Sequence, residues 1–242
     1  MKTINSKTIK VKKGKTKMVA HRGLSGLERE NSINAFVASC NRSYFGSECD
    51  IHYTKDKKLV VCHDNFTSRV SNYDIIIPES DFSDLELVRL KAFGKDEDGR
   101  ELIIPTFEEY LEIHKKYNKK CIVEIKCKIT LDEAKEILEI IKPYYKLIIF
   151  ISFDLNNLLL IRSLDKKIPL QYLSSKYDDS LLDVCENNNF GIDIHFAHLT
   201  KEITDKFHER KIVVNAWTVN DKEIAEELIS WGIDYITTNI LD

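Results

Sequence analysis

The stretch Met18-Val19-Ala20-His21-Arg22-Gly23 passes from three apolar residues directly into a histidine, an arginine and a glycine. An apolar run that ends this abruptly is typical of a buried strand that stops and hands polar side chains to a loop. The pattern recurs in three later runs, which carry Glu48, Asp50, His63, Asp64, Glu124 and Lys126. Four such runs predict a single site built at the ends of several strands.

Strand-like and helix-like segments alternate along almost the whole chain. The expected strands are 18–21, 46–52, 121–126, 147–151, 169–173, 190–194, 211–216 and 233–237. The expected helices are 31–43, 106–117, 130–142, 155–164, 178–188, 200–209 and 221–230. Such alternation implies parallel strands joined by helical crossovers. Eight units in this length, without a Gly-rich phosphate loop, favour a TIM (β/α)8 barrel over an open doubly wound sheet.

The segment after the second expected strand is the irregular part of the chain. An extension at 59–62 comes first, and the region 68–105 is rich in Asp, Ser and Gly. We expect one short helix near 81–91 and a turn at Asp98-Gly99, which together form a small insertion. No linker or change of composition is visible, so the sequence predicts one domain over 1–242 with a Lys-rich arm at 1–17.

The composition excludes several classes of protein. The chain of 242 residues is 43% hydrophobic and 31% charged with a net charge of −3, which argues against nucleic acid and against a general anionic-membrane binder. No run approaches the ~20 apolar residues of a membrane span, although peripheral membrane contact stays open. The N-terminus lacks the apolar core of a secretory signal, and the six cysteines form no CxxC pair. We therefore expect reduced thiols, no zinc site and a cytoplasmic location.

Three carboxylates fall where a barrel would bury them. Glu48 and Asp50 are two residues apart and share a strand face, and the same holds for Glu124 and Lys126. Buried carboxylates cost several kcal/mol unless they are paired or bound to a metal. Ion pairs with Arg22 and Lys126 would satisfy them, and so would a hard cation. Three oxygen ligands from Glu48, Asp50 and Glu124 suit Mg²⁺ or Ca²⁺, between which the sequence does not choose.

Two histidines complete the set of candidate catalytic residues. His21 and His63 each end an apolar run, and histidine gives or takes a proton near neutral pH. Arg22 has the fork geometry that holds two phosphate oxygens, and Lys126 adds a point charge. Two imidazoles, a divalent cation and two basic side chains suit a phosphodiester whose negative charge rises in the transition state.

An ordered set of motifs makes the interpretation specific. The motifs are Ala20-His21-Arg22-Gly23, Glu30-Asn31, Glu48-Cys49-Asp50, Val61-Cys62-His63-Asp64, Ile104-Pro105-Thr106-Phe107-Glu108-Glu109, Glu124-Ile125-Lys126, Ile151-Ser152-Phe153-Asp154 and Ala216-Trp217-Thr218-Val219-Asn220. In this order, from Met18 to Asn239, they resemble the glycerophosphodiester phosphodiesterase family.

The resemblance implies a TIM barrel whose site lies at the C-terminal ends of the strands. It implies metal-dependent hydrolysis of glycerophosphodiesters to glycerol 3-phosphate and an alcohol, through a cyclic phosphate. The matching positions are metal ligands Glu48, Asp50 and Glu124, acid/base histidines His21 and His63, phosphate contacts Arg22 and Lys126, and loop glutamate Glu30. Trp217 either walls the glycerol pocket or is a core aromatic. The resemblance does not say which histidine acts first as the base.

The sequence departs from the family pattern at several positions, and other functions are also compatible with parts of it. Arg29 stands where the family usually has proline, Ser32 where it has threonine, and Asn239 where the last strand often ends in aspartate. A lysophospholipase D-like activity would need an apolar groove, for which the run Tyr73-Asp74-Ile75-Ile76-Ile77-Pro78 is a candidate. A non-catalytic binding barrel and a sugar-phosphate isomerase fit the filled set of site residues less well. The alcohol leaving group and the oligomeric state are not defined by the sequence.

Overall fold

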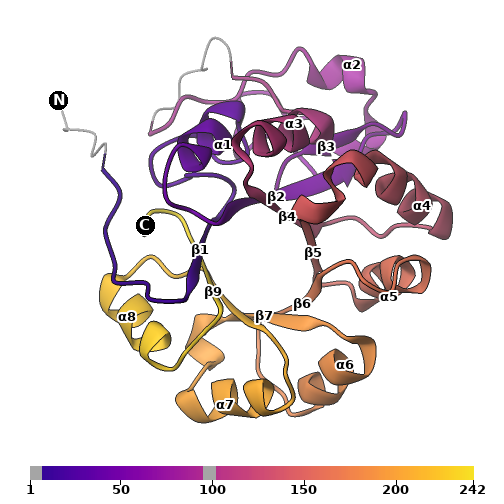
Figure 1. Ribbon diagram of the computed structural model, residues 1–242. Helices are drawn as coiled ribbons and strands as arrows, with labels where there is room; N and C mark the ends of the chain where they lie inside the picture. The colour runs from indigo at the N-terminus through magenta and orange to yellow at the C-terminus, as the bar shows by residue number, and fades with distance from the viewer. Residues whose placement is uncertain (1–6, 95–101) are drawn as a thin grey trace.

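Eight parallel strands close into a barrel in the computed structural model, which describes residues 7–94 and 102–242 (Figure 1). The strands are β1 (Lys17–Ala20), β2 (Gly46–Tyr53), β4 (Lys120–Ile125), β5 (Ile148–Ser152), β6 (Leu170–Ser174), β7 (Gly191–His195), β8 (Val214–Trp217) and β9 (Tyr235–Thr238). β1 pairs in parallel with both β9 and β2, which closes the ring. The predicted TIM (β/α)8 barrel is confirmed.

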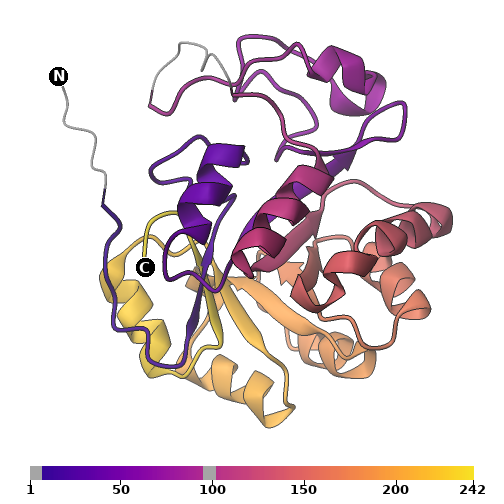
Figure 2. The same cartoon turned by 45° about the horizontal axis from the view of Figure 1, so that its top comes forward.

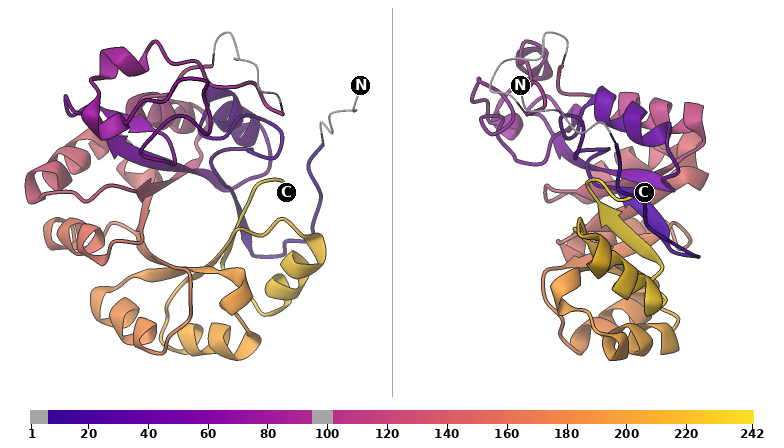
Figure 3. Two further views of the ribbon diagram at one scale, coloured as in Figure 1. Left: turned by 180° about the vertical axis from the view of Figure 1, so that it is seen from behind. Right: turned by 90° about the vertical axis from the view of Figure 1, so that its left-hand side faces the viewer.

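Helices surround the ring of strands, as the view from behind also shows (Figure 3). They are α1 (Ile33–Cys40), α3 (Phe107–Tyr117), α4 (Leu131–Ile140), α5 (Leu155–Leu164), α6 (Ser180–Asn188), α7 (Lys201–Glu209) and α8 (Lys222–Ser230). Two of them begin with a reciprocal capping box, in which Thr106 pairs with Glu109 and Thr130 with Glu133. Each helix follows its strand and returns the chain to the start of the next one, so all eight strands point the same way.

Alternation along the strands separates a helix-facing side from the barrel interior. On β2, Cys49 and Ile51 pack in the large core under the helices, which leaves Glu48 and Asp50 for the interior. The interior core is small and apolar, and its fully buried members are Val19, Ile122, Ile149, Ile151 and Leu173. The carboxylates of β2 therefore lie among inward-facing apolar side chains, where water is scarce.

The insertion lies between β2 and α3 and stands beside the barrel, as the tilted view shows (Figure 2). It holds β3 (Leu59–Val61), which is antiparallel to β2, the 3-10 turn η1 (Ile77–Glu79) and α2 (Phe82–Leu85). A second apolar cluster forms its own core, made of Val60, Cys62, Val70, Ile77, Leu85, Val88, Leu90 and Ile104. The predicted insertion after the second strand is thus confirmed.

The predicted helix 81–91 is wrong beyond Leu85. After α2 the chain becomes extended, because the Leu90 N–H donates to the Leu102 carbonyl and the Lys91 N–H to the Val70 carbonyl. These bonds to distant segments replace the helical ones, a tertiary effect that a local pattern does not show. The predicted turn at Asp98-Gly99 lies outside the described residues.

Two further features bear on the expectations from composition. All six cysteines are free thiols. Across 7–94 and 102–242, the helices are too short or too polar for any of them to cross a membrane.

Candidate active site

The three carboxylates predicted to bind a metal come together at β2 and β4. Asp50 and Glu124 are neighbours in the register of these strands, and Glu48 precedes Asp50 on the same face. One oxygen from each of the three carboxylates lies within 4.8 Å of the others. The exposed fractions of Glu48, Asp50 and Glu124 are 2%, 0% and 8%.

Two basic side chains balance part of this charge. Arg22 Nε lies 3.4 Å from Asp50 Oδ2, and Lys126 Nζ lies 3.0 Å from Glu124 Oε1 and 3.7 Å from Asp50 Oδ1. Asn31 adds a hydrogen bond from Nδ2 to Asp50 Oδ2 at 2.8 Å. Ion pairing, the alternative that the sequence left open, therefore balances part of the charge of Asp50 and Glu124, although the 3.7 Å contact leaves Asp50 Oδ1 without a hydrogen bond from the described residues.

Glu48 is held differently. The Arg22 backbone N–H donates to Glu48 Oε2 at 2.8 Å, and within the described residues no Lys or Arg side chain pairs with the Glu48 carboxylate. Burial and the charges of Asp50 and Glu124 raise the pKa of Glu48 well above its usual range. Glu48 Oε1 and Asp50 Oδ1 are buried and accept no hydrogen bond from that part of the chain. Two orphaned carboxylate oxygens beside Glu124 are what a site for a hard cation requires, so these residues fit one.

Backbone geometry explains how Arg22 serves both carboxylates. Arg22 has φ 54°, in the left-handed region, which turns its N–H toward β2. Gly23 follows with φ 72°, and a Cβ there would lie 2.7 Å from the Ala35 Cβ in α1. Only glycine fits between this loop and the helix, so the His-Arg-Gly motif is shaped by packing as well as by chemistry.

His21 follows β1 and faces the same end of the barrel. Its Nδ1–H donates to Asn239 Oδ1 at 2.8 Å, which leaves Nε2 with a lone pair. Burial and the nearby charge of Arg22 lower the pKa of His21 to about 4. The imidazole is therefore neutral near pH 7.

His63 follows β3 and has a more ionic environment. Its Nδ1–H donates to Asp64 Oδ1 at 2.7 Å, and Lys126 Nζ donates to its Nε2 at 3.2 Å. Burial lowers the pKa of His63, although the Asp50 charge and the Asp64 hydrogen bond act in the opposite direction. His52 bonds through Nε2 to the His63 carbonyl at 3.1 Å, so it supports the backbone that carries His63.

An ionic chain joins the surroundings of the two histidines. Glu30 accepts hydrogen bonds from Arg22 Nη1 at 2.8 Å and from both Arg69 Nη atoms at 2.8 and 2.9 Å. Arg69 Nε also donates to Asp64 Oδ2 at 2.5 Å. Glu30 therefore fixes the position of Arg22, and Arg69 orients the carboxylate that holds His63.

These groups open onto one cavity of about 90 Å³. It is lined by His21, Arg22, Glu48, His63, Glu124, Lys126, Ile151, Phe153, Leu173, Asp193, Trp217, Thr218 and Thr237. Of the site residues predicted from the sequence, Asp50 and Glu30 do not line this cavity. Trp217 forms one wall, and its ring meets Phe153 edge-on with centroids 5.6 Å apart.

Two residues of this region escaped the sequence analysis. Asp193 on β7 is 1% exposed, lines the cavity and has a buried Oδ1 that accepts no hydrogen bond in the described ranges. The sequence does contain a sign of this residue, because Asp193 is a charged residue between the apolar Ile192 and Ile194, and it faces inward. Arg69 lies in the irregular insertion, where no periodicity relates it to the barrel.

Most of the chain resembles a known protein family. The model of the "Glycerophosphoryl diester phosphodiesterase family" matches residues 21–242. A glycerophosphodiester phosphodiesterase of Caldanaerobacter subterraneus is 29% identical over 236 residues, covering 93% of this chain and 94% of the relative.

Solved structures of similar proteins have the same fold as this chain. A glycerophosphodiester phosphodiesterase from Parabacteroides distasonis superposes with a TM-score of 0.75 and 29% identity, over 93% of each chain. A phosphodiesterase from Oleispira antarctica, solved with the product sn-glycerol-3-phosphate, reaches a TM-score of 0.85 over 92% of each chain. At 23% identity this second match supports the fold alone.

Proposed function

Because the chain belongs to the glycerophosphoryl diester phosphodiesterase family and is thus a phosphoric diester hydrolase, we propose that it hydrolyses glycerophosphodiesters to glycerol 3-phosphate and an alcohol. The observation that carries this proposal is the convergence of three buried carboxylates and two histidines on one cavity. The product named in the Oleispira antarctica structure is consistent with it.

A divalent cation, Mg²⁺ or Ca²⁺, belongs to the proposal. Glu48, Asp50 and Glu124 would hold it, and the two orphaned oxygens of Glu48 and Asp50 are the support for this assignment. When bound, such an ion supplies positive charge to phosphate oxygens whose negative charge rises during the reaction.

The reaction proceeds in two displacements at phosphorus. The glycerol hydroxyl next to the phosphate ester attacks phosphorus and loses its proton, while the bond from phosphorus to the alcohol oxygen breaks and that oxygen gains a proton. The resulting cyclic phosphate is opened by water, which attacks phosphorus and releases glycerol 3-phosphate. Each step needs one base and one acid, so two histidines that exchange roles are sufficient.

The hydrogen bonds of the two histidines support a proposal for their first roles. His21 has a free Nε2 lone pair and a neutral amide oxygen on Nδ1, so it is the base that takes the hydroxyl proton. His63 has the Asp64 carboxylate on Nδ1, which favours the imidazolium against the effect of burial, so we propose that His63 protonates the leaving alcohol after the substrate phosphate has drawn Lys126 away from Nε2. Arg22 and Lys126 contact the phosphate, Glu30 keeps Arg22 in place, and Trp217 walls the glycerol moiety.

Asn239 offers a test of His21 as the base. Asn239→Asp would place a carboxylate on His21 Nδ1, which favours the imidazolium and raises the pKa of His21 by about 1 unit or more. Because the base must be neutral, the acidic limb of kcat/KM should move to higher pH by the same amount. pH–rate profiles of this variant and of the exposed control Asn156→Asp measure it. An acidic limb that stays in place in both variants would contradict the assignment.

Asp193 tests how the glycerol is held. Among the described residues Asp193 Oδ1 accepts no hydrogen bond, and the apolar Ile151 and Leu173 line the same cavity, so we propose that Asp193 pairs with a glycerol hydroxyl. Losing that bond costs ~1–3 kcal/mol, so Asp193→Leu should raise KM by about 10-fold or more. The melting temperature should not fall, since no internal bond is lost, and Asp193→Asn should retain part of the affinity. A normal KM in Asp193→Leu would remove Asp193 from the substrate site.

A substrate panel tests the proposed function. Glycerol 3-phosphate release is followed with glycerophosphocholine and glycerophosphoethanolamine, and choline release with lysophosphatidylcholine. The proposal expects turnover of the first two, with the cyclic phosphate visible by ³¹P NMR. Choline release from the lysolipid alone would favour the lysophospholipase D-like alternative, for which Tyr73 and Ile76 are exposed while Ile77 is buried in the insertion core. Failure with all three would favour a binding barrel.

A further inference from the structure

The end of the barrel opposite the cavity is strongly basic. We call it the N-terminal face. It consists of the eight segments that lead into the barrel strands, with the first residues of β1 and β4, and its ranges are 13–17, 41–45, 118–120, 141–147, 165–169, 189–190, 210–213 and 231–234. It carries Lys13, Lys15, Lys17, Arg42, Lys119, Lys120, Lys142, Lys146, Lys166, Lys167, Arg210 and Lys211. Its acidic residues are Asp165 and Asp234.

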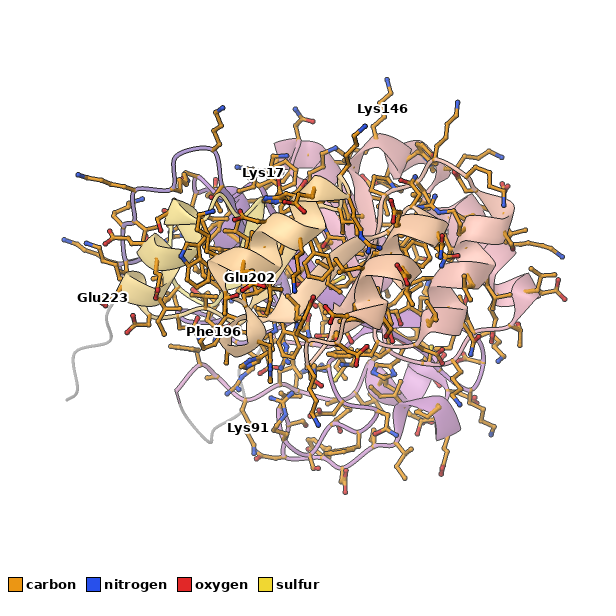
Figure 4. The ribbon with its side chains drawn as sticks, turned by 90° about the horizontal axis from the view of Figure 1, so that it is seen from below. Lys17, Lys91, Lys146, Phe196, Glu202 and Glu223 are labelled. Carbon is orange, nitrogen blue, oxygen red and sulfur yellow. The ribbon has the colours of Figure 1, made fainter. Side chains whose placement is uncertain are left out.

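The net charge of −3 conceals this asymmetry. Taking these twelve from the 36 Lys and Arg residues, and the two from the 39 Asp and Glu residues, leaves 24 basic against 37 acidic residues elsewhere. The segments of the N-terminal face therefore carry a net positive charge, and the rest of the sequence carries a net negative one. Figure 4 shows Lys17 and Lys146 on one side, and on the opposite side Phe196 and Lys91, the latter in the insertion.

Part of this charge has internal partners. Lys142 pairs with Glu139, Arg210 with Asp183 and Glu186, and Lys119 donates to the Arg42 and Tyr44 carbonyls. These contacts neutralise or bind part of the basic charge within the protein itself.

Lys13 Nζ also lies 3.8 Å from Asp242 Oδ1, and five other lysines of this face are exposed to solvent. Lys15, Lys146, Lys166, Lys167 and Lys211 are exposed, and none of them pairs with a carboxylate in the described part of the chain. Lys167 and Lys211 also line a cavity of about 180 Å³ at this end of the barrel. A set of unpaired like charges repels itself, which an anionic partner would relieve.

Apolar side chains lie among these lysines. Tyr145, Leu164 and Val213 are exposed at 37%, 39% and 38%, each in or next to a segment of the N-terminal face. Arg42 donates to the Ala38 carbonyl, and five exposed residues without a carboxylate partner in the described ranges are lysines, which are point charges rather than the planar forks that read individual phosphates. Diffuse lysine charge with scattered apolar side chains suits a lipid headgroup layer better than a nucleic acid.

We propose that the N-terminal face docks the protein on an anionic phospholipid bilayer. The acidic remainder of the molecule is repelled by the same surface, so docking is oriented. The cavity of the candidate active site lies at the C-terminal ends of the strands and then faces the solution. Resting on the proposed function, this orientation implies a water-soluble glycerophosphodiester rather than a lysolipid embedded in the same bilayer.

Vesicle binding tests the orientation with matched charge changes. The full chain is co-sedimented with vesicles of phosphatidylglycerol and phosphatidylcholine, or of phosphatidylcholine alone. The variant Lys146→Glu/Lys166→Glu/Lys211→Glu changes three unpaired lysines of the N-terminal face. The control Lys55→Glu/Lys128→Glu/Lys176→Glu makes the same change in net charge at exposed lysines of other segments.

We expect binding to the anionic vesicles alone, lost at ~0.5 M salt because the charges are screened. The N-terminal-face variant should bind on the order of 100-fold more weakly, and the control within about threefold of the wild type. Turnover of glycerophosphocholine in solution should be unchanged in the N-terminal-face variant, which separates this proposal from the proposed function. No binding to anionic vesicles, equal losses in both variants, or equally tight binding of a DNA duplex would each overturn it.

Discussion

Replacing His21 with alanine should lower kcat by a factor on the order of 10² to 10⁴, and replacing His63 should do the same. In the proposed mechanism each imidazole moves a proton in both displacements at phosphorus, so either substitution slows both steps. KM should change less than kcat, because Arg22 and Lys126 still face the cavity. The double variant should be little slower than the worse single variant, since groups that act as a pair are not additive.

The control is His208→Ala, a histidine on α7 that pairs with Asp234 at 3.0 Å, outside the cavity lining. It should keep wild-type kcat. Steady-state kinetics on the three variants, with melting temperatures to verify folding, measure the effect. Near-wild-type rates in both His21→Ala and His63→Ala would show that the two-histidine mechanism is incorrect.

Glu48→Gln should abolish metal-dependent turnover while the fold stays intact. The substitution keeps the shape and the hydrogen bond partner of the side chain but removes one of the three proposed anionic ligands. Because Glu48 is buried among like charges, the variant in EDTA should be at least as stable as the wild type.

Metal-induced stabilisation gives a readout independent of activity. At a metal concentration of 100 Kd, binding adds ~2.7 kcal/mol to the stability of the wild type. For a chain of this size that is a rise in Tm of about 5–10 °C. Glu48→Gln should show little of this rise, and the exposed control Glu209→Gln should show all of it. An equal rise in Glu48→Gln would contradict the ligand set, and so would full turnover.

Much of the fold was predictable because the barrel has a regular sequence signature. Each strand is a short apolar run followed by a helix with an apolar stripe, so order, direction and closure follow from alternation and length. The insertion was not predictable in detail. Its α2 ends at Leu85 because Leu90 and Lys91 bond to Leu102 and Val70, which are close only in the folded chain.

The site was predictable where a residue ends an apolar run. His21, Glu48, Asp50, His63 and Glu124 all do so or lie within one, and the structure brings them together. His114 shows the limit of such arguments. It lies in a run of charged residues, which suggests a solvated position, yet it is fully buried, and its ring bonds to Ser47 Oγ and to the Tyr110 carbonyl. Its position four residues after Tyr110 places it on the buried stripe of α3, which was the overlooked signal.

Release of glycerol 3-phosphate from glycerophosphocholine, measured before and after EDTA treatment and again with Mg²⁺ or Ca²⁺ restored, tests the central claim most directly. We predict that EDTA stops the release and that at least one of the two cations restores it. Release that continues undiminished in EDTA would contradict the metal-dependent site. No release under any of these conditions would contradict the proposed substrate.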